Sequence, residues 1–464
     1  MFCIRNKNTI FVFCIYEINN GVFCFVYETK KIYLYSVYKT IPDMNKEQIK
    51  QIIGENQEFV KDITFMERPF TFEDAGNYVF LGIRRAGKSY LMYQRIHQLL
   101  NKGHTIEEIL YINFEDERFI GLKSEELNDI KLAYEETFPY QPIFFLDEIQ
   151  VVDGWEKFVR RLVDKKYRVY VTGSNAKMLS SEIATTLGGR FLIQEVYPYS
   201  FREFLLSQDI ILKTNWLYTP SLRNEVVRTF DAYFYNGGFP ELIAFKDKRS
   251  WLSGLYQKIF FGDLVVRYAL RNSDSMSLLV KKLAESVMQP SSYNRLKNIV
   301  SSAGESVGVR TVIDYVGYLE ETWLIFSIEN YAARFAERES NRKYYFIDNG
   351  ILNLFIFNPE TLLLENLVAV SLYRMVGKEL YFYNQNVEVD FYIPDQKWLV
   401  QASYNISDTQ TFTREVNGLL KTAKFLKAEK LQIVTRNEER TVEQDGFTIE
   451  VIPIWKWMIM LENK

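Results

Sequence analysis

The eight residues from Gly82 to Ser89 restrict the fold of this chain more than any other segment. They lie between an apolar run, Tyr78–Leu81, and an amphipathic stretch, 90–100, and they read Gly82-Ile83-Arg84-Arg85-Ala86-Gly87-Lys88-Ser89. Glycines allow a tight turn, so that backbone N–H groups converge at the N-terminus of the following helix. The lysine adds a cation and the serine hydroxyl adds a metal ligand. The segment therefore predicts a phosphate-binding loop joining a strand to a helix in an α/β fold.

A second polar pair, Asp147 and Glu148, ends the apolar run 143–146. The carboxyl ends of parallel strands meet at one edge of a sheet, so we expect this pair beside the loop. There Lys88 would neutralise β- and γ-phosphates, while Ser89 and Asp147 would hold Mg²⁺. Glu148 would orient the water that attacks the γ-phosphoryl group. The two motifs together predict hydrolysis of a nucleoside triphosphate.

Two further segments offer polar groups to the same reaction. Ser174 and Asn175 follow the next apolar strand, and either could sense the γ-phosphate or position water; an ordinary Gly-Ser turn is the alternative. Arg190 could act as an arginine finger in its own site or in a neighbouring one, and a solvated arginine is the alternative.

The composition of the chain excludes several other classes of protein and of functional site. The chain is 47% hydrophobic and 16% aromatic, which is typical of a globular protein, and its 464 residues are too many for one hydrophobic core. Its net charge is −3, so a surface that binds nucleic acid would have to be a local basic patch. The cysteines, Cys3, Cys14 and Cys24, all lie near the start, which is typical of a reducing compartment, and we expect a cytoplasmic protein. The two histidines, His97 and His104, exclude a histidine-rich metal centre. No run is long and apolar enough for a membrane span.

Residues 1–43 differ from the rest. Apolar runs at 10–18 and 22–27 flank Asn19-Asn20-Gly21, which predicts a β-hairpin. A helical sequence begins at Met44, so the alternative is that translation starts there and the extension is not native. We assign it no function.

The rest of the chain divides into four predicted units. Alternating apolar runs and amphipathic stretches predict a parallel sheet within 44–196, with strands at 78–81, 109–114, 143–146, 168–171 and 191–196. A capping box at Ser200 to Glu203 begins a helical region, 197–290, which we interpret as a lid. Helix, turn, helix and strand within 291–342 indicate a winged helix. Strands and a helix in 343–464 indicate a second α/β domain.

Several segments together resemble a prokaryotic AAA+ ATPase family. They are Gly-Ile-Arg-Arg-Ala-Gly-Lys-Ser, Phe-Leu-Asp-Glu-Ile-Gln, Val-Thr-Gly-Ser-Asn, Tyr-Pro-Tyr-Ser-Phe-Arg-Glu-Phe, Asn-Gly-Gly-Phe-Pro-Glu and Tyr-Phe-Ile-Asp-Asn-Gly, and the resemblance covers about residues 44 to 464. It implies a P-loop ATPase core, a helical lid, a winged helix and a C-terminal domain similar to restriction-endonuclease-like folds. ATP is favoured over GTP by this resemblance, and no guanine-reading Asn-Lys-x-Asp motif occurs.

The C-terminal unit departs from a nuclease pattern. Such nucleases place an Asp on one strand and Glu-x-Lys on the next, around Mg²⁺. Glu388 and Asp390 supply the first part and Glu365 could assist, but Gln401 and Ser403 stand where Glu and Lys belong. We therefore expect a nuclease-like fold without hydrolytic activity, kept for binding DNA or a protein.

In the winged-helix segment, Arg295, Lys297 and Arg310 are the candidate phosphate contacts, with solvated helix faces as the alternative. The leading prediction is an ATPase that hydrolyses ATP with Mg²⁺ and controls a DNA- or protein-binding C-terminal half, in a monomer or a homo-oligomer. A nucleotide-gated binding module without turnover and an ATP-dependent nuclease are the alternatives.

Overall fold

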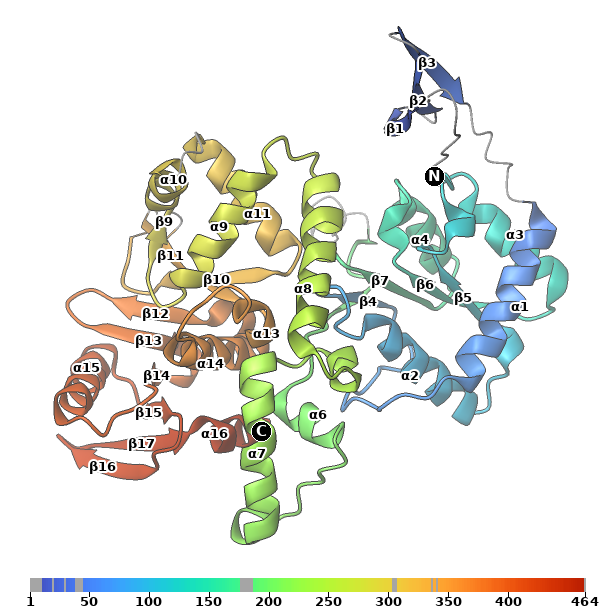
Figure 1. The fold of residues 1–464 in the computed structure, drawn as a ribbon. Coiled ribbons are helices and arrows are strands. Elements are labelled where there is room, and N and C mark those ends of the chain that lie inside the picture. The colour runs from blue at the N-terminus through green and yellow to red at the C-terminus, as the bar shows by residue number, and fades with distance from the viewer. Residues whose placement is uncertain are drawn as a thin grey trace.

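The computed structural model describes residues 11–18, 21–28, 31–37, 45–175, 187–302, 307–334, 337–338 and 341–462 (Figure 1). The N-terminal extension forms an antiparallel sheet of β1 (Phe11–Ile18), β2 (Gly21–Glu28) and β3 (Lys31–Val37). Strands β1 and β2 correspond to the two predicted hairpin runs. Asn19 and Asn20 of the predicted turn lie outside the described residues.

A parallel five-stranded sheet forms the first large body, in the order β5-β6-β7-β4-β8. Its strands are β4 (Tyr78–Leu81), β5 (Ile109–Asn113), β6 (Ile143–Asp147), β7 (Val169–Gly173) and β8 (Leu192–Glu195). The helices around it are α1 (Lys46–Asp62), α2 (Lys88–Asn101), α3 (Leu127–Thr137) and α4 (Trp155–Asp164). The predicted parallel α/β core is confirmed, and each predicted strand lies within about two residues of the observed one.

Helices follow from α6 (Phe201–Leu206), where the predicted capping box is present: the Ser200 side chain accepts from Glu203 N, and the Glu203 carboxylate accepts from Ser200 N. The next helices are α7 (Pro220–Asn236), α8 (Lys248–Lys258), the π-helix η7 (Ile259–Val266) and α9 (Ser273–Glu285). Helices α6 and α7 pack against C-terminal helices α13 (Asn349–Leu352), α14 (Glu360–Val376) and α16 (Ile454–Leu461). Only part of the predicted lid segment therefore reaches the phosphate loop.

The second large body contains one nine-stranded sheet, in the order β16-β17-β15-β14-β13-β12-β10-β11-β9. Its first members in the chain are β9 (Ser291–Ser292), β10 (Ile325–Asn330) and β11 (Asn341–Phe346), with α10 (Tyr293–Ser302) and α11 (Val309–Glu321) between β9 and β10. The others are β12 (Tyr381–Asn384), β13 (Glu388–Ile393), β14 (Trp398–Ala402), β15 (Lys430–Thr435), β16 (Arg440–Gln444) and β17 (Phe447–Pro453), with α15 (Thr409–Leu426). The predicted unit boundary after 342 falls inside β11, so the sheet continues across it.

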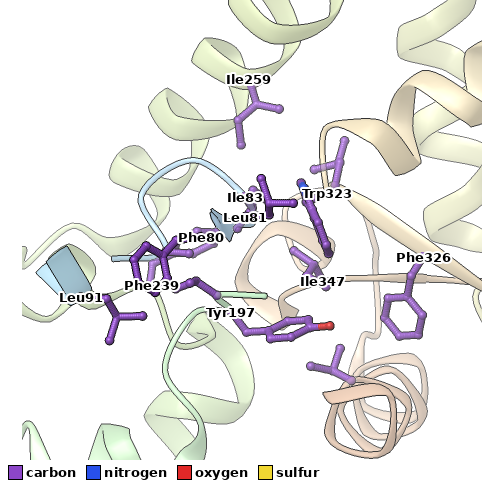
Figure 2. Packing of buried hydrophobic residues seen from close by; sticks show 14 of the residues in the cluster. Phe80, Leu81, Ile83, Leu91, Tyr197, Phe239, Ile259, Trp323, Phe326 and Ile347 are labelled. Atoms are coloured by element: carbon purple, nitrogen blue, oxygen red, sulfur yellow. The ribbon is translucent and has the colours of Figure 1, made fainter. Parts of the chain in front are cut away.

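One hydrophobic core joins the phosphate loop to this second body. Figure 2 shows the buried side chain of Ile83, from the loop, beside Trp323, which follows α11. The Trp323 ring lies edge-on to Tyr197, with centroids 6.5 Å apart, so the end of the first sheet is packed against the start of the second. No helix in the described part of the chain has the length and apolar character needed to cross a bilayer.

A close backbone contact links the segment Asn236–Glu241, the junction loop, to the C-terminal half. The buried carboxylate of Asp348 accepts hydrogen bonds from Gly238 N at 2.8 Å and Gly350 N at 2.8 Å. A Cβ on Gly350 would lie 2.1 Å from the carbonyl oxygen of Asn236. The junction loop can pack here only because residue 350 has no side chain.

Replacing Gly350 with alanine is expected to lower the free energy of unfolding by about 1–3 kcal/mol, because two backbone segments must separate to admit the methyl group. Gly254, inside α8, is the matched control, since a Cβ there would meet nothing within 4 Å. Alanine at 254 should stabilise the helix by about 0.5–1 kcal/mol. Urea unfolding followed by circular dichroism measures both, and equal stability of Gly350→Ala and wild type would show that the close contact is absent.

Candidate active site

The phosphate loop is closed around its own lysine. Lys88 begins α2 directly after Gly87, the N-cap, and its buried ammonium donates to the carbonyl oxygens of Gly82 at 3.1 Å and Ile83 at 3.2 Å. Gly82 must lack a side chain, because a Cβ there would lie 2.1 Å from the carbonyl oxygen of Val196. Lys88 is therefore held at the centre of the loop, where it would meet phosphate oxygens.

Asp147 ends β6 and faces the loop. The hydroxyl of Tyr111 donates to its carboxylate at 2.8 Å, the hydroxyl of Thr172 also donates, and a further hydrogen bond joins it to the side chain of Ser89. Burial and the neighbouring charge of Glu148 raise the pKa of Asp147. A hydroxyl and a carboxylate in contact are oxygen ligands of the kind that Mg²⁺ takes, so these two residues fit the ion.

Glu148 lies next to the lysine, with 3.6 Å between Lys88 Nζ and Glu148 Oε1. Its carboxylate also accepts from Gln150 Nε2 at 2.5 Å and is hydrogen-bonded to Ser174. Burial alone would raise the pKa of Glu148, but the ammonium of Lys88 and these hydrogen bonds outweigh it and hold the pKa below its ordinary value. The carboxylate is therefore charged at neutral pH and able to accept a proton or a hydrogen bond.

Ser174 and Asn175 are both buried at the end of β7. Ser174 contacts the Glu148 carboxylate, so the structure brings it into the site. Together, the ends of β4, β6 and β7 bring Lys88, Asp147 and Glu148 to one edge of the sheet.

The two arginines of the phosphate loop form ion pairs with residues of the segment 197–290. Arg84 forms ion pairs of 2.9 Å with Asp263 of η7 and 2.9 Å with Glu115 after β5. Arg85 pairs with Glu241 at 2.5 Å and lies over the ring of Trp251 at 5.7 Å. Both arginines also line a cavity of about 880 Å³. Sequence analysis assigned no role to Asp263, or to Glu241 at the end of the segment Asn-Gly-Gly-Phe-Pro-Glu, since each pairs with an arginine far away in the sequence.

Arg190 lies away from the site of its own chain, which corrects the possibility that it acts there. Its guanidinium pairs with Asp164 at 2.8 Å, and its carbonyl accepts from Asn77 Nδ2 at 3.1 Å. Asn77 precedes β4 and Arg190 precedes β8, so both lie at the amino edge of a parallel sheet whose carboxyl edge carries the loop. Any arginine-finger role therefore requires a neighbouring copy.

A buried charge cluster occupies the C-terminal half. Lys343 on β11 is fully buried, and its ammonium lies 3.3 Å from Glu365, 3.0 Å from Glu388 and 3.1 Å from Asp390. Burial alone would lower the pKa of Lys343, but the three carboxylates outweigh it and keep the pKa above its ordinary value. We define Lys343, Glu365, Glu388 and Asp390 as the lysine cluster.

Sequence analysis did not identify Lys343, which places an ammonium beside Asp390 from a strand that lies far from Gln401 and Ser403 in the sequence. The side chain of Gln401 accepts from Asp390 N at 3.2 Å, and Asp390 accepts from Ala402 N at 3.0 Å. The Gln401 side chain thus joins β14 to the backbone of β13, and it also forms a hydrogen bond with the carboxylate of Glu415. Among the described residues, no group of three or more His, Cys, Asp or Glu side chains is arranged to hold a metal ion.

The basic residues of the predicted winged helix lie on exposed helix faces. Arg295 donates to Pro290 O at 3.2 Å and Gln289 Oε1 at 2.8 Å, and Arg310 lies 3.4 Å from Asp314. Lys297 donates to Asn298 Oδ1 at 3.4 Å. These contacts leave all three residues near the surface.

Comparisons with known proteins place this geometry in a family. Uncharacterized protein MJ1544 of Methanocaldococcus jannaschii is 33% identical over 429 residues, covering 88% of this chain and 95% of that protein. The chain belongs to the family of MJ1544. An uncharacterized protein of Haemophilus influenzae is 31% identical over 398 residues, covering 82% of this chain and 94% of that protein.

Two domain families match parts of the chain. Residues 75–205 match the AAA domain family, and residues 227–361 match a domain of unknown function, DUF8612. The first range contains the five-stranded sheet and the phosphate loop, so this part of the chain is an AAA-type P-loop ATPase domain. A Walker-type ATPase of Pyrococcus abyssi, with 13% identity and a TM-score of 0.38, covers 67% of this chain and 95% of its own, a similarity too low to add to this conclusion.

Proposed function

We propose that the protein binds ATP with Mg²⁺ and hydrolyses it to ADP and phosphate, and that the nucleotide state controls a DNA- or protein-binding C-terminal half. The observation that carries the proposal is the convergence of Lys88, Ser89, Asp147 and Glu148 at one edge of the AAA domain. Lys88 would supply the cation, Ser89 and Asp147 the oxygen ligands, and Glu148 the charged carboxylate that phosphoryl transfer requires.

The residues would act as follows. Lys88 exchanges the carbonyl oxygens of Gly82 and Ile83 for phosphate oxygens, and the loop amides at the start of α2 bind the same anion. Ser89 and Asp147 would hold Mg²⁺, which neutralises charge on the β- and γ-phosphates. Glu148 orients the attacking water and accepts its proton. Release of Lys88 from Glu148 on ATP binding frees that carboxylate for the water.

Residues 273–346 would form the winged helix. The order α9, β9, α10, α11, β10, β11, with β11 between β9 and β10 in the sheet, is the arrangement of a small helical unit closed by a β-wing. This unit begins one helix earlier than the segment 291–342. Its exposed Arg295 and Arg310 and its half-buried Lys297 would contact phosphates of DNA.

The C-terminal sheet would be a nuclease-like fold without hydrolytic activity. Mg²⁺ does not fit the lysine cluster, because the ammonium of Lys343 already lies within 3.3 Å of the three carboxylates that a metal would need. This domain would therefore bind DNA or a protein without cutting DNA.

Purified protein is expected to release phosphate from ATP in the presence of Mg²⁺, and to do so faster when its partner is bound. Phosphate release measured with and without duplex DNA distinguishes an ATPase that responds to DNA from one that responds to a protein partner. Stimulation by DNA supports the proposal in full, and turnover without stimulation points to a protein partner. ATP binding in calorimetry with no phosphate release would favour the nucleotide-gated binding module, and plasmid cleavage lost in Asp390→Ala would favour the nuclease.

A further inference from the structure

The backbone of Glu148 is fixed while its carboxylate depends on side-chain partners. Glu148 has a left-handed conformation with φ of 52°, and its N–H donates to Thr172 Oγ1 at 2.8 Å. A glutamate side chain has three rotatable bonds, so a fixed backbone does not fix the carboxylate. Its direction must come from the groups that contact it.

Those groups differ in whether they remain after ATP binds. Lys88 would turn to phosphate oxygens, and its 3.6 Å contact with Glu148 would weaken. Gln150 donates to Glu148 Oε2 at 2.5 Å and lies 3.5 Å from Ser174 Oγ. Neither Gln150 nor Ser174 has a charge that a phosphate would attract. Gln150 is therefore the close donor that stays with Glu148 through the reaction.

The other end of the same amide has no partner. Gln150 Oε1 is buried and accepts no hydrogen bond within the described part of the chain. A buried acceptor that lacks a hydrogen bond destabilises the fold unless a ligand or a water molecule satisfies it. A water molecule has two protons, and one carboxylate oxygen accepts only one of them. Gln150 Oε1, on the amide that holds Glu148, could accept the second.

We propose that Gln150 is a positioning residue of the ATPase site: its Nε2 aims the Glu148 carboxylate, and its Oε1 accepts a hydrogen bond from the attacking water. The proposal rests on the proposed ATPase function. It assigns a role to the residue two positions after Glu148 in the segment Leu-Asp-Glu-Ile-Gln. It also predicts that Gln150 acts through Glu148, so the two residues should behave as one unit.

The test is a double-mutant cycle. Gln150→Met, similar in length and without polar atoms, is expected to lower kcat about tenfold to hundredfold while the Kd for ATP changes less than about twofold. In the Glu148→Gln background the same substitution should have almost no further effect on kcat. Gln141→Met is the matched control, since exposed Gln141 lies two residues before β6, at the opposite end of that strand, and should leave kcat unchanged.

The possible results distinguish failure of the role of Gln150 from failure of the ATPase function. Full activity of Gln150→Met, or equal additional loss in both backgrounds, overturns the role of Gln150 alone. Absence of turnover in wild type overturns the ATPase function and this proposal together. Gln150→Asn covers the case in which the methionine variant is unstable: it keeps the amide but is one methylene shorter, so it adds no charge and withdraws both amide atoms from Glu148, and a similar loss of kcat is expected with little change in melting temperature.

Discussion

Glu148→Gln is expected to reduce kcat for ATP by about 10²- to 10⁴-fold, the range contributed by a positioned general base. Glutamine has the same shape, so it keeps the contacts with Gln150 and Ser174 in outline but cannot accept a proton. Lys88, Ser89 and Asp147 are unchanged, so nucleotide affinity should stay within a few fold of wild type. Single-turnover phosphate release gives the rate, and calorimetry with ATP and Mg²⁺ gives the affinity.

Glu117→Gln is the control for that experiment, because Glu117 is an exposed carboxylate at the start of the 3-10 helix η2 (Glu117–Phe119), which follows β5. It should leave both quantities unchanged. Turnover at the wild-type rate by Glu148→Gln would remove Glu148 from the base role. Loss of ATP binding by the same variant would mean that Glu148 maintains the structure of the phosphate loop. That result would contradict its assignment as a base that acts only on the attacking water.

Lys343→Met is expected to lower the free energy of unfolding by about 3–5 kcal/mol, the usual cost of removing one partner from a buried ion pair. The substitution leaves Glu365 and Asp390 buried without a cation. Burial and the charge of Asp390 already raise the pKa of Glu365, and one oxygen of that carboxylate, Oε2, has no hydrogen-bond partner in the described residues. Without the ammonium, both carboxyl groups must take up protons or attract water.

Urea unfolding at neutral pH measures this loss, with exposed Lys281→Met as the control that removes a positive charge without affecting the lysine cluster. The control should stay within about 0.5 kcal/mol of wild type. A loss as small in Lys343→Met would show that the ammonium does not compensate the carboxylates. Stabilisation by Mn²⁺ in the absence of ATP that is kept in Asp147→Ala and lost in Asp390→Ala would show instead that a metal enters the lysine cluster.

The features that sequence analysis predicted correctly depend on local rules. The phosphate loop, the strand ending at Asp147 and the capping box at Ser200 are each encoded within about ten residues. Parallel topology then determined that Asp147 and the loop share an edge. The same rule could have excluded Arg190 from its own site, since it precedes a strand of that sheet.

The features that were missed depend on distant parts of the chain. Lys343 reaches Asp390 only because β11 enters the sheet beside β10, which in turn pairs with β12. Asp263 and Glu241 meet the loop arginines because a π-helix and the junction loop fold back over the AAA domain. Strand β9 has two residues and is too short to give a periodic pattern.

The parallel pairing of β10 with β12 has a mechanical consequence. Glu329 and Asn330 pair with Tyr381 and Phe382, and the side chain of Asn330 exchanges hydrogen bonds with the backbone of Asn384. Rotation of the helical unit relative to the C-terminal strands would break this strand pairing and these hydrogen bonds. The helical unit and the C-terminal strands are therefore expected to move as one rigid body, so that a displacement of either is transmitted to the other.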